Sequence, residues 1–512
     1  MSVREWYKGK NVLLSGGTGF MGKVLVEKLL RSCTDIGTIF IICRSKRGVN
    51  PSQRIADFAK LPLFAPLLKQ NPKALQKLIA IEGDITEEDL GLKPEVKQKL
   101  QQNVNIIFHV AASLKLEAGL KEAVDFNLKG TKRMLELALG IKNLEVFVHL
   151  STAFCHCEED VLQEKLYEPL YDPHDIMRAM DWMNDRIIDV ITPKLLDHHP
   201  SCYTFTKRLA ESLVAEYGSK LPLTVVRPSI VVPSMKEPFP GWVDSLNGPI
   251  GVMAAAGKGV LRSMLCKPDF RAEMVPVDVA INIIISAAYS RAKKQTKEVL
   301  TYNISSGDNV PIIWGDLVDL GKTIIRENPY DAGLWYPGGT IRTNPYLHAI
   351  IVFLCQTIPA YLIDFIMLLT RNKRFMVRVQ NRIRLGMELL QYFTMRQWNF
   401  KTEQTIDIIQ NLKPEEQEIF FLPLKNVDVK ELIKNAIIGS RVYCLKEPLE
   451  NLPRARRHLK WLYWLDKISQ LCLVLLFAWL LVSYVPMLHH MINVITPDFA
   501  ASTMMHKVAK TA

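Results

Sequence analysis

The stretch VLLSGGTGFMG at residues 12–22 decides the fold class of this 512-residue chain. A short apolar run predicts a buried strand, and the glycine pattern Gly16-x-x-Gly19-x-x-Gly22 follows it and opens a helical pattern. In such a strand–turn–helix unit, glycines allow a tight turn and bring the backbone close to a pyrophosphate at the helix N-terminus. We therefore predict a Rossmann-type dinucleotide-binding domain rather than a structural turn. The residues expected to contact the cofactor in this turn are Gly16, Thr18, Gly19, Phe20, Met21 and Gly22.

Short apolar runs alternate with longer helical patterns through the first half of the chain. This alternation is typical of an α/β fold with a doubly wound parallel sheet. The irregular, proline-rich stretch 158–200 is expected to lie over the cofactor cleft. Long helices are expected at residues 119–139 and 203–217, and the further strands at residues 38–42, 78–81, 104–110, 145–150 and 224–226.

The second predicted strand leads into the run Arg44-Ser45-Lys46-Arg47, which contains no acid. An NAD site usually places an acid here for the ribose 2′-hydroxyl, whereas cations suit the 2′-phosphate of NADP. We therefore predict NADPH as the cofactor, with Arg44 and Lys46 as phosphate ligands, and a solvated basic turn is the alternative. Asp84, after the third predicted strand, is expected to contact the adenine or to cap its loop.

Small residues end the fourth predicted strand in the run His109-x-Ala111-Ala112. They would let the cofactor pack closely against the strand end, and Ala111 is a predicted cofactor contact. His109 is interpreted as structural rather than catalytic. Asn127, on the helix that follows, is expected to order the active site through its backbone or a water molecule.

A tyrosine and a lysine lie at the start of a predicted helix as Tyr203-x-x-x-Lys207. This spacing places both side chains on one face of the helix. Thr152 follows the fifth predicted strand and would bring a hydroxyl to the same cleft. We expect Tyr203 to donate a proton to a carbonyl oxygen and Thr152 to donate a hydrogen bond to it, while Lys207 lowers the tyrosine pKa and holds the nicotinamide ribose. Carbonyl reduction is therefore predicted, and a helix-surface pair with a strand-end cap is the alternative.

Charge and cysteine content narrow the classes of partner. The chain carries a formal net charge of +12, and its basic clusters at residues 371–384 and 454–460 lie beside apolar stretches. We expect both clusters to face a membrane, and no nucleic-acid partner is predicted. The nine cysteines show no metal-ligand spacing, so no metal site is predicted. The polar N-terminus lacks the apolar core of a signal peptide, which favours a cytosolic catalytic part.

The most apolar segment, residues 468–488, contains no Asp, Glu, Lys or Arg and can cross about 30 Å of hydrocarbon. Aromatic residues flank it, and a basic cluster precedes it, so a single-pass C-terminal anchor with a cytosolic N-terminus is predicted. A buried core helix is the alternative. A second apolar segment, residues 346–370, carries Asp364 as its only charge and is expected to lie in the membrane interface or to form a shallow hairpin.

Together these residues resemble the extended short-chain dehydrogenase/reductases. Further motifs are similar to those of the animal fatty acyl-CoA reductases, and this resemblance runs from about residue 7 to the C-terminal anchor. The motifs are RPSIV at residues 227–231, KEPFPGW at 236–242, NGP at 247–249, GKG at 257–259 and VPVD at 275–278.

The resemblance implies NADPH-dependent reduction of long-chain acyl-CoA to a primary alcohol through a bound aldehyde, for wax ester and ether lipid synthesis. It also implies contact with membrane lipid, in the peroxisomal membrane or alternatively the endoplasmic reticulum. It leaves the acyl chain length and the oligomeric state open. The implied domains are an NADPH-binding reductase domain at residues 1–285, a connecting region at 286–354 with a membrane-associated segment from about 346, a helical family domain at 355–447 and a transmembrane anchor at 468–488.

The chain departs from the family pattern at three positions. The family usually has Thr where Ser15 stands, Tyr where Phe154 stands and Gly where Val232 stands, and Val232 is expected to crowd the cofactor or acyl channel. The set Thr152, Tyr203 and Lys207 is intact, which favours an active enzyme. The alternatives are an extended reductase acting on a sterol or steroid and a catalytically weakened cofactor-binding membrane protein.

Overall fold

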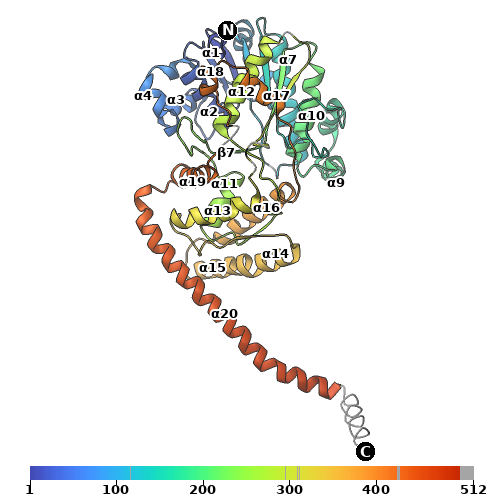
Figure 1. Cartoon of the computed structure of the whole chain (residues 1–512). Coiled ribbons are helices and arrows are strands. Elements are labelled where there is room, and N and C mark those ends of the chain that lie inside the picture. The colour runs from blue at the N-terminus through green and yellow to red at the C-terminus, as the bar shows by residue number, and fades with distance from the viewer. Residues whose placement is uncertain (116, 295, 308–309, 311, 424–426, 496–512) are drawn as a thin grey trace, which may run out of the picture.

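Two lobes and a long C-terminal helix make up the molecule (Figure 1). The computed structural model describes the chain except for residues 116, 295, 308–309, 311, 424–426 and 496–512, and it describes side chains as far as residue 485.

The larger lobe is built on a parallel sheet of seven strands in the order β10-β6-β5-β4-β1-β2-β3. The order reverses at β1, which pairs with β2 on one side and with β4 on the other. The predicted doubly wound sheet is therefore confirmed. The sheet also extends past residue 285, because β10 pairs with β6. The strands are β1 Val12–Ser15, β2 Ile39–Cys43, β3 Leu78–Glu82, β4 Ile106–His109, β5 Val146–Leu150, β6 Leu223–Pro228 and β10 Leu300–Ile304.

Helices cover both faces of this sheet because side chains alternate along each strand. Leu14 belongs to the core beneath α2 and α12, whereas its neighbour Leu13 belongs to the core beneath α5, α7 and α10. The sheet is thus the middle of three layers. The helices of this lobe are α1 Val3–Tyr7, α2 Phe20–Ser32, α3 Pro51–Ala56, α4 Ala65–Gln70, α5 Pro94–Asn103, α6 Leu120–Ala123, the π-helix η5 Val124–Lys129, α7 Gly130–Leu139, α10 Cys202–Glu216 and α12 Val277–Lys293.

The stretch 158–200 contains two helices, α8 (Pro173–Trp182) and α9 (Asp185–Leu196). They contact α6, η5 and α10, so they cover the outside of the helical layer. Residues 158–200 are all described, and none of them lines the cofactor cavity. The expectation that this stretch covers the cleft is therefore wrong. The physical reason is that Met177 and Met180 of α8 are buried in the core shared with α10.

The smaller lobe combines helices from both halves of the chain, since α13 packs against α19 and α11 packs against both. The predicted helical C-terminal region is confirmed, but α17 returns to the larger lobe and contacts α12 and β10. The elements outside the larger sheet are α11 Pro249–Gly257, α13 Trp314–Glu327, α16 Met376–Thr394, α17 Glu403–Gln410, α18 Pro414–Ile419, α19 Val429–Gly439, and the strand pairs β7 Ile230–Val232 with β9 Met274–Pro276 and β8 Ser263–Leu265 with β11 Thr340–Arg342.

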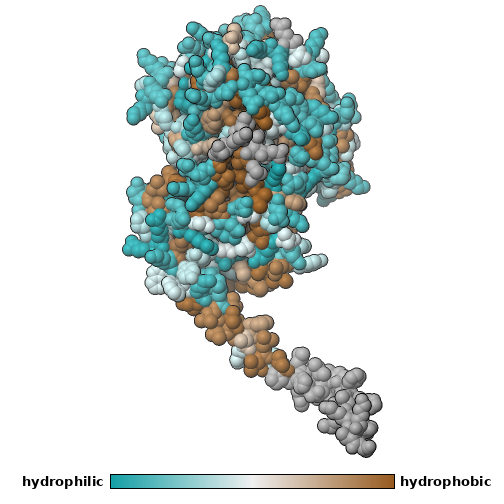
Figure 2. Space-filling view, in the orientation of Figure 1, coloured by the Kyte–Doolittle hydropathy of each residue, from teal (hydrophilic) through white to brown (hydrophobic). Residues whose placement is uncertain are grey.

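Two helical segments are long and apolar enough to cross a membrane. One is Pro345–Leu369, where α14 (Pro345–Val352), a π-helical turn and α15 (Ile358–Leu369) follow one another. The other is Leu449–Val485, which includes most of α20 (Leu452–Ile495). Helix α20 leaves the lobes and presents hydrophobic residues along its exposed length (Figures 1 and 2). The last residues of the predicted anchor lie beyond the described side chains.

Candidate active site

A cavity of about 610 Å³ lies at the carboxyl ends of the sheet strands. In open α/β sheets, ligands bind at this edge where the strand order reverses. The cavity brings together residues that follow six strands of the sheet, from β1 to β6. All of the predicted site residues line it: Gly16, Thr18, Gly19, Phe20, Met21, Gly22, Arg44, Lys46, Asp84, Ala111, Thr152, Tyr203 and Lys207.

The glycine turn after β1 has no room for side chains at two of its positions. Gly16 has a φ of +78°, and a Cβ there would lie 2.6 Å from the Ala111 nitrogen. A Cβ on Gly22 would lie 2.3 Å from the Gly16 oxygen. Gly19 is the N-cap of α2 and makes no side-chain cap, so the first N–H groups of the helix stay available to an anion. This cradle fits a dinucleotide pyrophosphate.

Three cations line the cavity beside this turn, namely Arg44, Lys46 and Arg54. One Arg54 nitrogen donates to Thr18 Oγ1 at 3.0 Å, and the other donates to the Arg44 carbonyl oxygen at 2.6 Å. Arg44 also forms an ion pair with Asp84 at 3.0 Å. Burial works to raise the pKa of Asp84, but hydrogen bonds lower it below its usual value. Positive charge is therefore concentrated at the position expected for the 2′-phosphate of an NADP-type dinucleotide.

Arg54 was missed by reasoning from the sequence. It lies on α3, whose start is signalled by the N-cap Asn50 followed by Pro51. That signal predicts the short helix, but it does not predict which side of the helix meets the cleft. The burial of Ile55 in the core fixes the rotation of α3, and this contact depends on the tertiary structure.

Tyr203 and Lys207 lie one turn apart on α10, which begins after the N-cap Ser201. Lys207 Nζ donates to the Leu150 carbonyl oxygen at 2.7 Å, so its ammonium is held at the end of β5. Burial raises the pKa of Tyr203 well above its usual value and lowers the pKa of Lys207 to about 8. The expected lowering of the tyrosine pKa by Lys207 stays a prediction, because burial has the largest effect on the pKa of Tyr203 here.

Thr152 follows β5, and its hydroxyl lies close to the tyrosine. A hydrogen bond between Thr152 and Tyr203 acts to lower the tyrosine pKa, against the larger effect of burial. Thr152 Oγ1 also accepts from the Phe154 N–H at 3.3 Å and lies 3.5 Å from the Pro228 oxygen. The strand end thus orients the threonine hydroxyl beside the phenol.

His109 and Asn127 belong to the layer beneath the cavity. The His109 ring lies 2.7 Å from Ser15 Oγ and 3.1 Å from Thr131 Oγ1, and burial lowers its pKa to about 3. It is a neutral hydrogen-bonded core residue, and Ser15 supplies the hydroxyl that the family usually takes from Thr. Asn127 bonds to the Ser113 N–H at 2.9 Å and donates to Thr206 of α10 at 3.0 Å. Asn127 therefore links the end of β4 to the helix that carries Tyr203.

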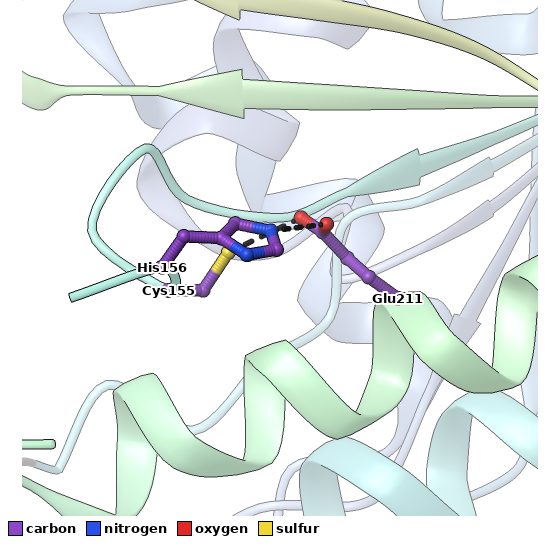
Figure 3. A group of neighbouring side chains, drawn as sticks. All are labelled: Cys155, His156 and Glu211. Atoms are coloured by element: carbon purple, nitrogen blue, oxygen red, sulfur yellow. Dashed lines mark hydrogen bonds and ion pairs between the residues drawn. The ribbon is translucent and has the colours of Figure 1, made fainter. Parts of the chain in front are cut away.

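Cys155, His156 and Glu211 form a buried cluster between α10 and the loop after β5 (Figure 3). Their potential ligand atoms lie within 4.8 Å of one another, as a metal site would require. Glu211, however, is paired with Arg227 of β6 at 2.6 Å, and it also accepts from Cys155 at 3.2 Å and lies 2.9 Å from His156 Nε2. The carboxylate is thus already neutralised and hydrogen-bonded. We interpret the cluster as a network that ties α10 to β6 and to the Thr152 loop.

The other two departures from the family pattern, Phe154 and Val232, line the cavity. Phe154 packs edge to face against Phe393, Trp398 and Phe400 of the C-terminal region. Val232 of β7 is buried, and its side chain lines the cavity. Both positions join the dinucleotide-binding lobe to the smaller lobe.

Comparisons with known proteins identify the family of this chain. Two family models, both described as "Male sterility protein", match residues 14–284 and 355–447. Fatty acyl-CoA reductase 1 of Rattus norvegicus is 38% identical over 459 residues, which cover 90% of this chain and 89% of the relative. Fatty acyl-CoA reductase 2 of Bos taurus is 35% identical over 458 residues, with the same coverage of 90% and 89%.

Solved structures support the fold alone. The terminal R domain from the myxalamid PKS-NRPS biosynthetic pathway matches with a TM-score of 0.57 and 18% identity, over 85% of this chain and 91% of that chain. The reductase domain of a nonribosomal peptide synthetase from Mycobacterium tuberculosis matches with a TM-score of 0.57 and 16% identity, over 86% and 92% of the two chains. The identity shared with these relatives over 90% of the chain, together with the two family models, makes this chain a member of the fatty acyl-CoA reductase family of oxidoreductases.

Proposed function

We propose that this protein reduces long-chain fatty acyl-CoA to the primary fatty alcohol with NADPH. The observation that carries the proposal is the single cavity lined by the glycine turn, by the three cations and by Thr152, Tyr203 and Lys207. The relatives named fatty acyl-CoA reductase support the acyl-CoA substrate. Wax esters and ether lipids are the proposed fates of the alcohol.

The proposed chemistry assigns one task to each side chain. NADPH, when bound at the glycine turn, supplies the hydride. Tyr203 remains protonated at neutral pH because burial raises its pKa, so its hydroxyl can donate a proton to the substrate oxygen. Thr152 donates a hydrogen bond to the same oxygen. Lys207, with a pKa of about 8, is mostly charged at neutral pH and holds the nicotinamide ribose.

The overall stoichiometry tests the proposed function. Conversion of a thioester to an alcohol takes two hydrides and two protons. The first reduction breaks the C–S bond, releases CoA as its thiol and leaves an aldehyde, which the second reduction converts to the alcohol. We expect two NADPH oxidised per CoA released, measured by absorbance and by a thiol reagent, with little free aldehyde. One NADPH per CoA with accumulating aldehyde would contradict the second step.

Cofactor preference should depend on the cationic pocket. Arg44→Ala or Arg54→Ala is expected to lower kcat/KM for NADPH by roughly 10- to 150-fold, because each removes a charge-assisted hydrogen bond of about 1.5–3 kcal/mol to the 2′-phosphate. The kcat/KM for NADH should change little. Arg47→Ala is the control, since Arg47 does not line the cavity. Equal efficiency of the native protein with both cofactors would rule out the proposed phosphate site.

We further propose that the enzyme is a membrane protein, with α20 as its C-terminal anchor and the catalytic lobes in the cytosol. The peroxisomal membrane is the proposed location on the family resemblance, with the endoplasmic reticulum as the alternative. The proposed domain limits are 1–285, 286–354, 355–447 and 468–488. Two elements of the second segment belong to the lobes themselves, since β10 is part of the seven-stranded sheet and α13 packs in the smaller lobe.

Removal of the chain after Gln470 is expected to release the protein from membranes only in part. This cut removes the apolar part of α20 but keeps Asp466, which contacts Trp335 and Arg262. The segment Pro345–Leu369 remains, and most of its apolar length is exposed. Sedimentation with membranes would measure the bound fraction.

Adding Phe365→Glu to the truncated chain should complete the release, because Phe365 is an exposed residue of α15 and its replacement sets a charge in the proposed interface. A truncated chain that is already fully soluble would show that α14 and α15 make no membrane contact.

A further inference from the structure

A second cavity, of about 120 Å³, adjoins the cofactor cavity and is lined almost entirely by apolar side chains. The two cavities share Ile230, Val232, Pro249 and Ile250 as a common wall. The remaining lining comes chiefly from four helices, α11, α13, α16 and α19. An elongated apolar group that starts at the catalytic residues would therefore find its continuation here.

Gly321 lines this cavity from the interior of α13. A glycine inside a helix lowers helix stability relative to alanine, so its presence needs a local reason. Backbone conformation does not require glycine here, because Gly321 does not adopt the left-handed conformation. Close packing does not require glycine either, because a Cβ added at this buried position would meet no neighbouring atom within 4 Å. What glycine provides at residue 321 is open space on the cavity side of the helix.

Val232 occupies the wall between the cavities. It is buried, and it lines the cofactor cavity, the apolar cavity and a third, smaller one. Its side chain therefore narrows the connection between the catalytic residues and the apolar cavity. Val232 borders both cavities, whereas Gly321 lines the apolar cavity and not the cofactor cavity.

We propose that the apolar cavity receives the acyl chain of the substrate, that the chain passes Val232, and that Gly321 leaves room for the carbons furthest from the thioester. The longest chain accepted is thus set by the space above Gly321. The proposal rests on the proposed acyl-CoA reduction for the identity of the ligand.

The test compares Gly321→Leu with Gly386→Leu in the full-length protein. Gly386 lies inside α16, where an added Cβ also meets no atom within 4 Å, but it does not line the apolar cavity. The kcat/KM values are measured from octanoyl-CoA to eicosanoyl-CoA. Gly321→Leu should lower kcat/KM for the longest chains by about fourfold per displaced methylene group, and leave octanoyl-CoA unchanged. Gly386→Leu should keep the native chain-length profile.

Two further variants distinguish the effect of cavity volume from an effect on folding. Gly321→Ala should keep the profile and raise thermal stability slightly, because alanine favours the helix. Val232→Gly should raise kcat/KM for long chains relative to short ones. A native profile in folded Gly321→Leu would overturn the role of Gly321, and a native profile in Val232→Gly would overturn the proposed passage.

Binding of the same acyl-CoAs without NADPH, measured by calorimetry, distinguishes this inference from the proposed function. If the native protein reduces no acyl-CoA but Gly321→Leu still weakens binding of the long chains alone, the cavity assignment stands and the proposed reaction fails. If the native protein reduces acyl-CoA but Gly321→Leu binds all chain lengths as the native protein does, the cavity assignment fails and the reaction stands.

Discussion

Replacing Tyr203 by phenylalanine is expected to lower kcat by roughly 100- to 10,000-fold, the range of a lost general acid. The substitution removes only the hydroxyl beside Thr152, so the affinity for NADPH should stay nearly unchanged. Lys207→Ala should lower both kcat and NADPH affinity, because the ammonium is proposed to hold the ribose as well. Steady-state kinetics and NADPH fluorescence titration would measure the two effects.

The control for this experiment is Tyr217→Phe. Tyr217 is the C-cap residue of the same helix and does not line the cavity, so the loss of its hydroxyl should leave kcat unchanged. Normal turnover in Tyr203→Phe would show that another group protonates the substrate oxygen. A loss of NADPH affinity as large as the loss of turnover would point instead to a structural role for the hydroxyl.

The parts of the site that were predicted from the sequence are those that local physics determines. The turn from Gly16 to Gly22 needs glycine for local reasons, namely the positive φ of Gly16 and the close approach of Gly22 to the Gly16 oxygen. Tyr203 and Lys207 share a face because of helical periodicity, whatever α10 packs against. The strand ends carry Arg44 and Thr152 to one edge because parallel strands share their direction. Each of these residues lines the cavity, as expected.

The parts that were missed depend on contacts between distant segments. Strand β10 includes Thr301, Tyr302 and Asn303, so it lacks the apolar run of the central strands, yet it completes the sheet beside β6. The shift in the Tyr203 pKa follows from burial, which the spacing of residues does not report. The apolar cavity joins α13 to α16 and α19, and no local pattern predicts that such segments meet.

The second large effect is expected from Glu211→Ala, which should destabilise the protein by roughly 3–5 kcal/mol. The substitution leaves the Arg227 guanidinium uncompensated, and in the native pair the two side chains are only 0% and 3% exposed. It also removes the acceptor for Cys155 and the partner of His156. Natural domains are stable by about 5–15 kcal/mol, so this loss is a large share of the total. The unfolding temperature of the detergent-solubilised protein should fall by on the order of 10 °C.

The matched control is Glu216→Ala on the same helix. Glu216 pairs with His174 at 2.8 Å, but their side chains are 43% and 40% exposed, so the loss should be within about 1 kcal/mol. Equal unfolding temperatures for the two variants would show that the buried cluster does not stabilise α10.

The pH dependence gives a second measure of the same ion pair. Burial works to raise the pKa of Glu211, but the Arg227 guanidinium lowers it below the ordinary value of 4.5. Because the folded pKa lies below the unfolded one, the stabilisation is fully present above the unfolded value and is lost as the pH falls through the folded value. The native protein should therefore lose stability more steeply below pH 4.5 than Glu211→Gln, which has no carboxylate to protonate. Parallel acid unfolding curves would show that the Glu211–Arg227 ion pair makes no such pH-dependent contribution to stability.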